Sequence, residues 1–159
     1  MKQYIRSKVL IEGDSGRLKE IITLFGSYTE EPYIRPEKIL PLKNDTPEER
    51  KALWGCEELE ETDVVLYHQE TKLEYSFDTL HTPPFCLYEK IAEICQDLKV
   101  SVRYASEELG EDCGWLVSLP DDNKLTSQTI EDPFLFACEI WDKDPEEEQY
   151  EIWINEMEE

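Results

Sequence analysis

The chain has 159 residues, enough for one domain with a buried core, and its 40% apolar and 11% aromatic residues exceed what an acidic disordered chain contains. Its 38 Asp and Glu outnumber its 16 Lys and Arg, which gives a formal net charge of −22. A charge of this sign repels nucleic acid and anionic lipid and attracts basic surfaces, so we expect no direct nucleic-acid binding and no membrane binding.

The first third of the chain predicts alternating strands and helices. Near alternation of β-forming residues favours a strand over residues 3–12. An amphipathic helix follows to about Phe25, and then a loop broken by three prolines, with a short strand near Ile39–Leu42. The capping signal Thr46-Pro47-Glu48-Glu49 begins a short helix that should end by Gly55.

Two strands, a second long helix and a hairpin are predicted next. The segment Val64–Tyr67 is rich in β-forming residues, and residues 73–77 alternate between apolar and polar side chains, as in a half-buried strand. Thr82-Pro83 predicts the start of a helix. Residues 100–105 alternate again, and Trp115–Leu119 should pair with them as a hairpin.

The last part of the chain carries two more helix-start signals. Asp132-Pro133 predicts a helix through Trp141, and Asp144-Pro145 predicts another one. The apolar residues of the final segment fit both a helical stripe and a strand, and we choose the helix because of its capping signal and its length. We expect the segment between the two halves of the chain, Glu57–Asp63, to be a solvated loop.

The order of these elements predicts an α+β fold: a ferredoxin-like two-layer sandwich with the helices on one face of an antiparallel sheet and a helical C-terminal tail. Residues 1–125 would form the ferredoxin-like domain, and residues 126–159 an acidic helical extension packed on it. The two main helices, at about 15–25 and 83–98, should share one face of the sheet. Their residues Leu18, Ile22, Ile91 and Ile94 should be buried against Val9, Phe77 and Val102.

Several segments of the sequence resemble a known family. They are the strand and helix that begin at Ile5, the pair Trp54-Gly55, the run Tyr75-Ser76-Phe77-Asp78-Thr79, the turn Thr82-Pro83-Pro84, and Tyr104 followed by Glu107, Gly110 and Gly114. Together they are similar to the YubB-type ferredoxin-like family of phages, plasmids and prophage-bearing bacteria. The resemblance spans roughly residues 3–120 and implies a ferredoxin-like fold and a mobile-element origin. The family's role is largely unassigned, and no catalytic residue carries over.

The sequence contains no recognisable catalytic or metal-binding motif. His68 and His81 have no Cys or second His at metal-ligand spacing, and the six glycines form no phosphate-binding loop. The five cysteines are scattered without a Cys-x-x-Cys pair, and the N-terminal residues lack the apolar stretch of a signal peptide. We therefore expect a cytoplasmic protein with reduced thiols, without a cofactor and without enzymatic activity.

The acidic residues are concentrated in the second part of the chain. Residues 1–56 carry ten bases and nine acids, a net charge of +1, whereas residues 57–159 carry six bases and 29 acids, a net charge of −23. Solubility alone calls for a net charge of about 2–8 in a small domain. We expect a partner-binding surface made of Glu57, Glu58, Glu60, Glu61, Glu107, Glu108, Glu111, Asp112, Glu146, Glu147, Glu148 and Trp153.

Two functions remain open at this level, beside a merely solubilising or halophilic surface. Carboxylates spaced over a rigid fold can imitate a phosphate backbone, and the protein would then bind a basic protein or nucleoprotein. A mobile-element protein of this kind would act as a DNA mimic that inhibits a host defence system, of the anti-CRISPR or anti-restriction type. The alternative is a ligand-binding or catalytic module with a pocket near His81, Tyr104 and Cys113.

Overall fold

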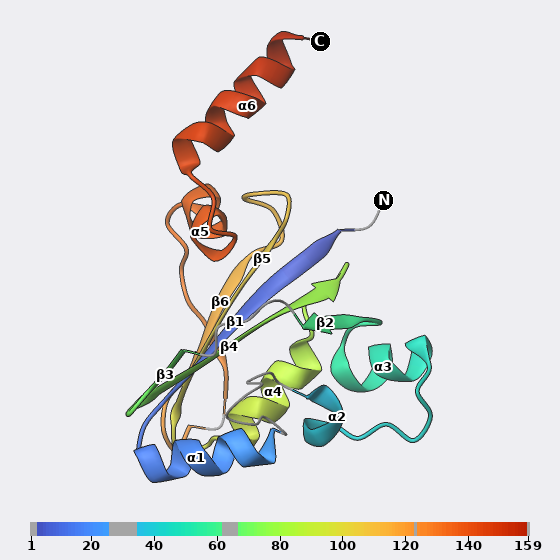
Figure 1. The fold of residues 1–159 in the computed structure, drawn as a ribbon, viewed down its shortest axis with the longest axis vertical. Coiled ribbons are helices and arrows are strands. Elements are labelled where there is room, and N and C mark those ends of the chain that lie inside the picture. Colours follow the sequence, from blue (N-terminus) through green and yellow to red (C-terminus); the bar gives the residue numbers. More distant parts are fainter. Residues whose placement is uncertain (1–2, 26–34, 62–66, 123, 159) are drawn as a thin grey trace.

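The computed structural model describes residues 3–25, 35–61, 67–122 and 124–158. An antiparallel sheet runs through the molecule with the strand order β2-β4-β1-β5-β6-β7, and β3 also pairs with β4 (Figure 1). The strands are β1 (Tyr4–Glu12), β2 (Leu59–Glu61), β3 (Tyr67–Gln69), β4 (Lys72–Leu80), β5 (Lys99–Ser106), β6 (Gly114–Ser118) and β7 (Thr126–Ser127). β1 is central, because it pairs with β4 on one side and with β5 on the other.

The helices connect these strands in a recognisable pattern. They are α1 (Ser15–Leu24), α2 (Pro36–Ile39), α3 (Pro47–Trp54), α4 (Phe85–Ile94), α5 (Pro133–Ile140) and α6 (Pro145–Met157). α4 joins β4 to β5, which run parallel to each other on either side of β1. α1 follows β1 on the way to β2 and β3, which both pair with β4. This is the split β-α-β arrangement, and the α+β ferredoxin-like fold is confirmed.

One face of the sheet carries the main core, because alternate residues of β1, β4 and β5 turn toward α1 and α4. Leu18 of α1 and Ile91 of α4 are fully buried in this core together with Val9, as predicted. The prediction that Ile22 and Ile94 are buried is wrong, because both are half-buried at the margin of the core. The residue next to each of them is buried instead: Ile21 beside Ile22, and Cys95 beside Ile94.

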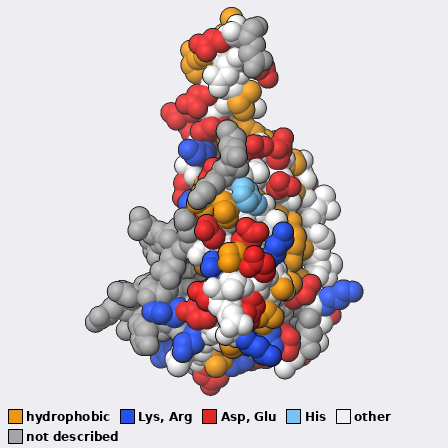
Figure 2. Space-filling model, turned by 90° about the vertical axis from the view of Figure 1, so that its right-hand side faces the viewer, with side chains coloured by type: hydrophobic (Ala, Val, Ile, Leu, Met, Phe, Trp, Pro, Cys, Tyr) orange, Lys and Arg blue, Asp and Glu red, His pale blue; other side chains and the backbone are white. Residues whose placement is uncertain are grey.

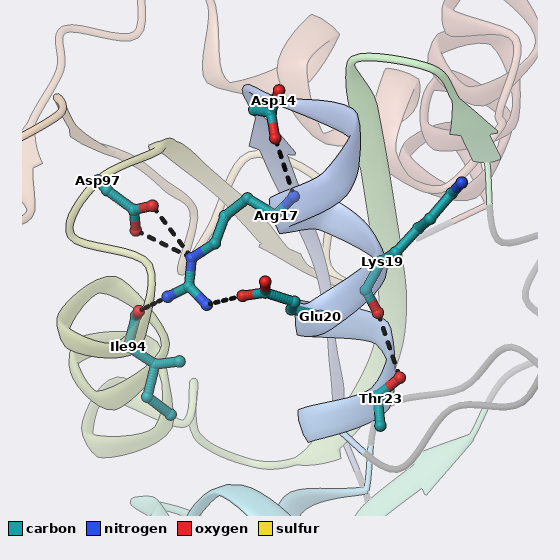
Figure 3. A network of polar contacts seen from close by, with 7 residues as sticks. All are labelled: Asp14, Arg17, Lys19, Glu20, Thr23, Ile94 and Asp97. Carbon is teal, nitrogen blue, oxygen red and sulfur yellow. Dashed lines mark hydrogen bonds and ion pairs between the residues drawn. The ribbon is translucent and has the colours of Figure 1, made fainter.

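Arg17 ties α1 to the segment that follows α4 (Figure 3). Its Nε lies 3.0 Å from the carboxylate of Asp97, and one terminal nitrogen lies 3.0 Å from Glu20. The other terminal nitrogen donates to the carbonyl oxygen of Ile94 at 2.9 Å. The carboxylate of Asp14 caps α1 by accepting from the backbone N–H of Arg17 at 3.1 Å. One side chain therefore links two helices that lie far apart in the sequence.

α3 forms as its capping signal predicts. The hydroxyl of Thr46 accepts from the N–H of Glu49 at 3.2 Å, and the Glu49 carboxylate accepts in turn from the N–H groups of Lys43 and Asn44. The helix ends at Gly55, whose φ of 91° is left-handed and disfavours any side chain. The capping residues thus set both ends of this helix.

Three local predictions are wrong. The residues near Ile39–Leu42 form no strand: Ile39 ends α2, a short helix whose first residue, Pro36, has a φ suited to helix. Glu57–Asp63 is not only loop, because Leu59–Glu61 pairs with β4 as an edge strand. Thr82 does not cap α4, which begins at Phe85; its hydroxyl donates to the carbonyl of Gly55 at 2.9 Å instead.

The predicted strand Val64–Tyr67 lies mostly outside the described residues, and only its last residue, Tyr67, belongs to β3. The hairpin predicted at Trp115–Leu119 is confirmed as β6, which pairs with β5. The sequence did not indicate β7, a strand of two residues that pairs with β6. Short edge strands of this kind carry too few residues for a periodic pattern.

α5 covers one end of the opposite face of the sheet. Ala105 of β5 is buried there against Ala137 and Ile140 of α5. The indole N–H of Trp141 donates to the carbonyl of Ala105 at 3.0 Å, and the guanidinium of Arg6 lies 4.2 Å from the centroid of the Trp141 ring. α5 therefore packs on the sheet, whereas α6 projects away from it at one end of the molecule (Figure 1).

Candidate functional site

The loop between β5 and β6 holds four of the predicted partner-binding acids, Glu107, Glu108, Glu111 and Asp112; we call it the acidic loop. Its backbone is fixed by three hydrogen bonds. Glu107 donates to the carbonyl of Tyr4 at 3.0 Å, Glu108 donates to the Ser106 hydroxyl at 2.9 Å, and Glu111 donates to the carbonyl of Glu108 at 3.0 Å. The four carboxylates are consequently carried by an ordered turn.

The acidic loop concentrates negative charge in a short stretch of chain. The carboxyl of Glu111 shares a hydrogen bond with that of Glu108, and this contact together with the charge of Glu108 raises the pKa of Glu111. Burial and then the charge of Asp112 raise the pKa of the Cys113 thiol. Among the described residues, no Lys, Arg or His forms an ion pair with any of the four loop carboxylates.

The second predicted cluster lies across the same end of the sheet and consists of Glu57, Glu58, Glu60 and Glu61. The carbonyl of Glu58 accepts from the N–H of Leu80, the last residue of β4, at 3.1 Å. Leu80 is paired with Tyr4, whose own carbonyl accepts from Glu107. Neighbouring strands are about 4.8 Å apart, so three such steps place the backbones of Glu58 and Glu107 roughly 14 Å from each other. The structure therefore brings these two clusters to one end of the sheet.

Two residues of that second cluster, Glu60 and Glu61, are described only in their backbone, which belongs to β2. Glu57 is exposed, and its carbonyl accepts from the guanidinium of Arg50 at 2.8 Å. Glu58 is half-buried.

The third predicted cluster lies on α6. Glu146, Glu147 and Glu148 occupy its first turn, where the positive end of the helix dipole favours acids, and Asp144 caps it by accepting from the N–H of Glu146 at 2.9 Å. Trp153 is exposed, as a partner-facing role would require. α6 rises from the end of the sheet where the acidic loop lies (Figure 1), and acidic side chains recur along it and over the upper part of the body (Figure 2).

The ion pairs of the described residues lie elsewhere in the protein. Six ion pairs connect described residues, and all of them lie on the body of the fold rather than in the acidic loop or on α6. Arg6 is bonded to Asp78, and Arg103 to Glu139, on the face that α5 partly covers. The ion pairs between described residues thus lie on the body, whereas the acidic loop and α6 contain acids without a base.

A groove of about 530 Å³ lies between α5 and the sheet, at a place that the sequence did not indicate. Its lining comes from two neighbouring strands and from the segment that begins α5: Arg103, Trp115, Thr129, Ile130, Glu131, Asp132, Leu135, Phe136 and Glu139. Trp115 pairs with Arg103 across β5 and β6. No sequence signal marked the groove, because it depends on contacts between segments some thirty residues apart.

The residues of the alternative pocket are placed differently. Tyr104 stacks on Tyr88 with ring centroids 6.1 Å apart, on the helix-covered face, and a side chain at Gly114 would overlap its ring. Burial and then the nearby Cys113 raise the pKa of Tyr104. His81 is exposed in the turn after β4, with a φ of 66°. None of these three residues lines the groove beside α5.

Within the described ranges, no group of three or more His, Cys, Asp and Glu is placed to hold a metal ion. All five cysteines are free thiols, and burial raises the pKa of Cys56 and of Cys95 to about 12. In the same part of the chain, every helix is too short or too polar to cross a bilayer.

Comparisons of the chain with protein-family models, with curated proteins and with solved structures find no match. The resemblance to the YubB-type family therefore stays a prediction. The ferredoxin-like fold rests on the strand order and on the two crossovers described above. Any functional assignment must come from the chemistry of the acidic end itself.

Proposed function

We propose that the protein is a non-enzymatic interaction protein whose acidic end binds a basic, nucleic-acid-binding partner, as a DNA mimic that inhibits a host defence system of the CRISPR or restriction type. The observation that supports it is the acidic loop, which carries four carboxylates on a hydrogen-bonded turn and forms no ion pair with any base that the structure describes. The mobile-element origin implied by the sequence resemblance favours a defence complex as the target.

Crowding of like charges in the acidic loop costs free energy. The raised pKa of Glu111 reports that its carboxylate is less stable as an anion beside Glu108 than it would be alone. A partner that brings lysines or arginines to this loop removes that repulsion and gains charge-assisted hydrogen bonds. Because the turn is already ordered, little conformational entropy is lost on binding.

The test is a charge reversal of the whole acidic loop, Glu107→Lys, Glu108→Lys, Glu111→Lys and Asp112→Lys. The partner is first captured from host lysate at low salt and released at high salt. We expect the reversal to slow association with the purified partner by about tenfold or more at low ionic strength. The single change Asp112→Asn should leave binding nearly intact, because one exposed charge contributes little.

A matched control separates this local effect from net charge. The changes Glu37→Lys, Glu48→Lys, Glu70→Lys and Glu89→Lys also reverse four exposed acids, but on other parts of the body. They should slow association far less. Equal slowing by both sets of four would mean that only the total charge matters, and retardation of free DNA by the unmodified chain would contradict mimicry outright.

A further inference from the structure

α6 carries an apolar stripe that is mostly exposed, since only Ile154 of its four residues is half-buried. Tyr150, Trp153, Ile154 and Met157 recur at i, i+3, i+4 and i+7 and so share one face of the helix; we call them the α6 stripe. Tyr150 is 60% exposed, Trp153 54% and Met157 67%, and no residue of α6 is buried. The rings of Tyr150 and Trp153 contact each other with centroids 5.9 Å apart. The stripe is a continuous apolar ridge on a projecting helix.

A helix of this kind needs a surface to pack on. α6 has 13 residues, and isolated helices of about this length are only marginally stable in water. Most helix stability in proteins comes instead from packing of the apolar face. The charges of α6 destabilise it further, because its last turn has no base and Glu156 and Glu158 lie at the negative end of the helix dipole. Binding of the α6 stripe to a second surface would supply the missing packing.

The charge around the stripe decides which surface fits. The segment from Asp144 to Glu158, both included, contains seven acids and no base. A second copy of α6 would bring the same seven acids, and an anionic lipid surface would repel them in the same way. An apolar groove flanked by lysines and arginines matches both the stripe and its acidic borders.

We propose that α6 is a docking helix that inserts its apolar stripe into a groove, rimmed by lysines and arginines, on the partner protein. This rests on the proposed function for the partner's basic character. Trp and Tyr are the residues most often found as energetic anchors of interfaces, and here they are adjacent. The acidic loop then governs the rate of association, and the α6 stripe governs the rate of dissociation.

The experiment uses the full chain and two synthetic peptides of identical leucine and lysine composition. In the helical peptide the leucines recur at i, i+3, i+4 and i+7, so that they form an apolar face bordered by lysines. In the shuffled peptide leucine and lysine alternate, so that no helical stripe exists. We expect the chain to bind the helical peptide more tightly than the shuffled one, by about tenfold or more.

Variants on two faces of α6 locate the contact. Trp153→Ser with Met157→Ser removes half of the stripe, and should weaken binding of the helical peptide about 30-fold without changing that of the shuffled peptide. Ile152→Ser is the matched control, because Ile152 is 45% exposed on the same helix but lies about 200° from Tyr150. It should leave both affinities unchanged. The unfolding midpoint of each variant should equal that of the parent chain.

The possible outcomes separate the two proposals. Equal affinity for the two peptides, or equal loss in Ile152→Ser and in the double variant, would overturn the docking helix and leave charge-driven binding intact. Failure to bind either peptide at low salt would overturn the basic partner as well. Sedimentation of the free chain as a dimer that the double variant dissociates would identify a second copy as the occupant and contradict the proposal.

Discussion

α1 and α6 follow the same sequence pattern and end in opposite environments. Both place apolar residues at i, i+3, i+4 and i+7. In α1 that face is packed against the sheet, with Leu18 and Ile21 fully buried, while no residue of α6 is buried. The spacing of apolar residues therefore predicts a helix and its apolar face, but what covers that face is decided by the rest of the molecule. For α6 the described residues leave most of that face exposed.

The two helices also differ in how their charges are balanced. Arg17 of α1 is bonded to Asp97, to Glu20 and to the carbonyl of Ile94 (Figure 3). α6 contains acids without a base, and its apolar residues are bordered by them. α1 is thus completed by the chain itself, whereas α6 is the helix for which we propose a partner.

The largest expected difference is in stability. Ile21→Ala in α1 should lower the free energy of unfolding by about 2–5 kcal/mol, because it leaves a cavity in the core. Met157→Ala in α6 should change it by no more than about 0.5 kcal/mol, because the side chain contacts mostly water. Urea unfolding followed by circular dichroism measures both. A large loss in the α6 variant would mean that the stripe is covered within the chain.

A smaller effect is expected from the charges of α1. Arg17→Ala should cost about 1 kcal/mol or less, because Asp97 and Glu20 are half or more exposed. Part of that loss should persist at high salt, since the hydrogen bond to the Ile94 carbonyl is not an ion pair. Urea unfolding at two salt concentrations measures it. Lys90→Ala, which breaks only an exposed pair with Glu93, is the control and should cost less at either salt.

Reversing the charge at the end of α6 should stabilise that helix slightly. Glu156→Lys and Glu158→Lys place bases at the negative end of the dipole, and each should contribute about 0.3–1 kcal/mol. Amide hydrogen exchange of α6 should slow as a result. The same changes at Glu146 and Glu147, in the first turn, should speed exchange. If both pairs of variants exchange at the parent rate, the dipole has no influence on α6.

The smallest effect concerns the proton on the acidic loop. Glu108→Gln removes the carboxylate that raises the pKa of Glu111, first through a side-chain hydrogen bond and then through its charge, so that this pKa should fall toward the usual carboxyl value near 4.3. In the parent chain the repulsion destabilises the fold above the raised pKa and is relieved as the pH falls through it. Carbon-detected NMR titration of Glu111 measures the change, and Glu107→Gln should leave it unaltered.

The parts of the fold that could be predicted from the sequence are those with local signals. The capping residues at Thr46, Asp132 and Asp144 set three helix starts, and the alternation in β4 and β5 marked two strands of the central sheet. β2 was missed because its glutamates disfavour a strand. Its pairing comes from backbone hydrogen bonds to β4, which no side-chain pattern records.

The candidate site divides in the same way. Acidic residues are visible in any sequence, and the acidic loop could be proposed from composition alone. Its fixed turn could not, since it depends on the bond between Glu107 and Tyr4, more than a hundred positions away in the chain. The groove between α5 and the sheet depends on non-local contacts as well, such as the hydrogen bond between Arg103 and Glu139, 36 positions apart. Long-range geometry of this kind leaves no local trace.

The central position of β1 sets the order in which the protein can fold during synthesis. Among the strands of the described ranges, β1 pairs with β4 and β5 alone. Its first partner residues are therefore at Lys72 and beyond, and Ile5 meets Ser106. At roughly 5–20 residues per second, the ribosome delivers that first partner on the order of several seconds after β1. During this interval β1 emerges as an unpaired strand of alternating apolar residues. Such strands bind chaperones or aggregate, so the yield of folded protein should depend on translation speed across residues 13–71.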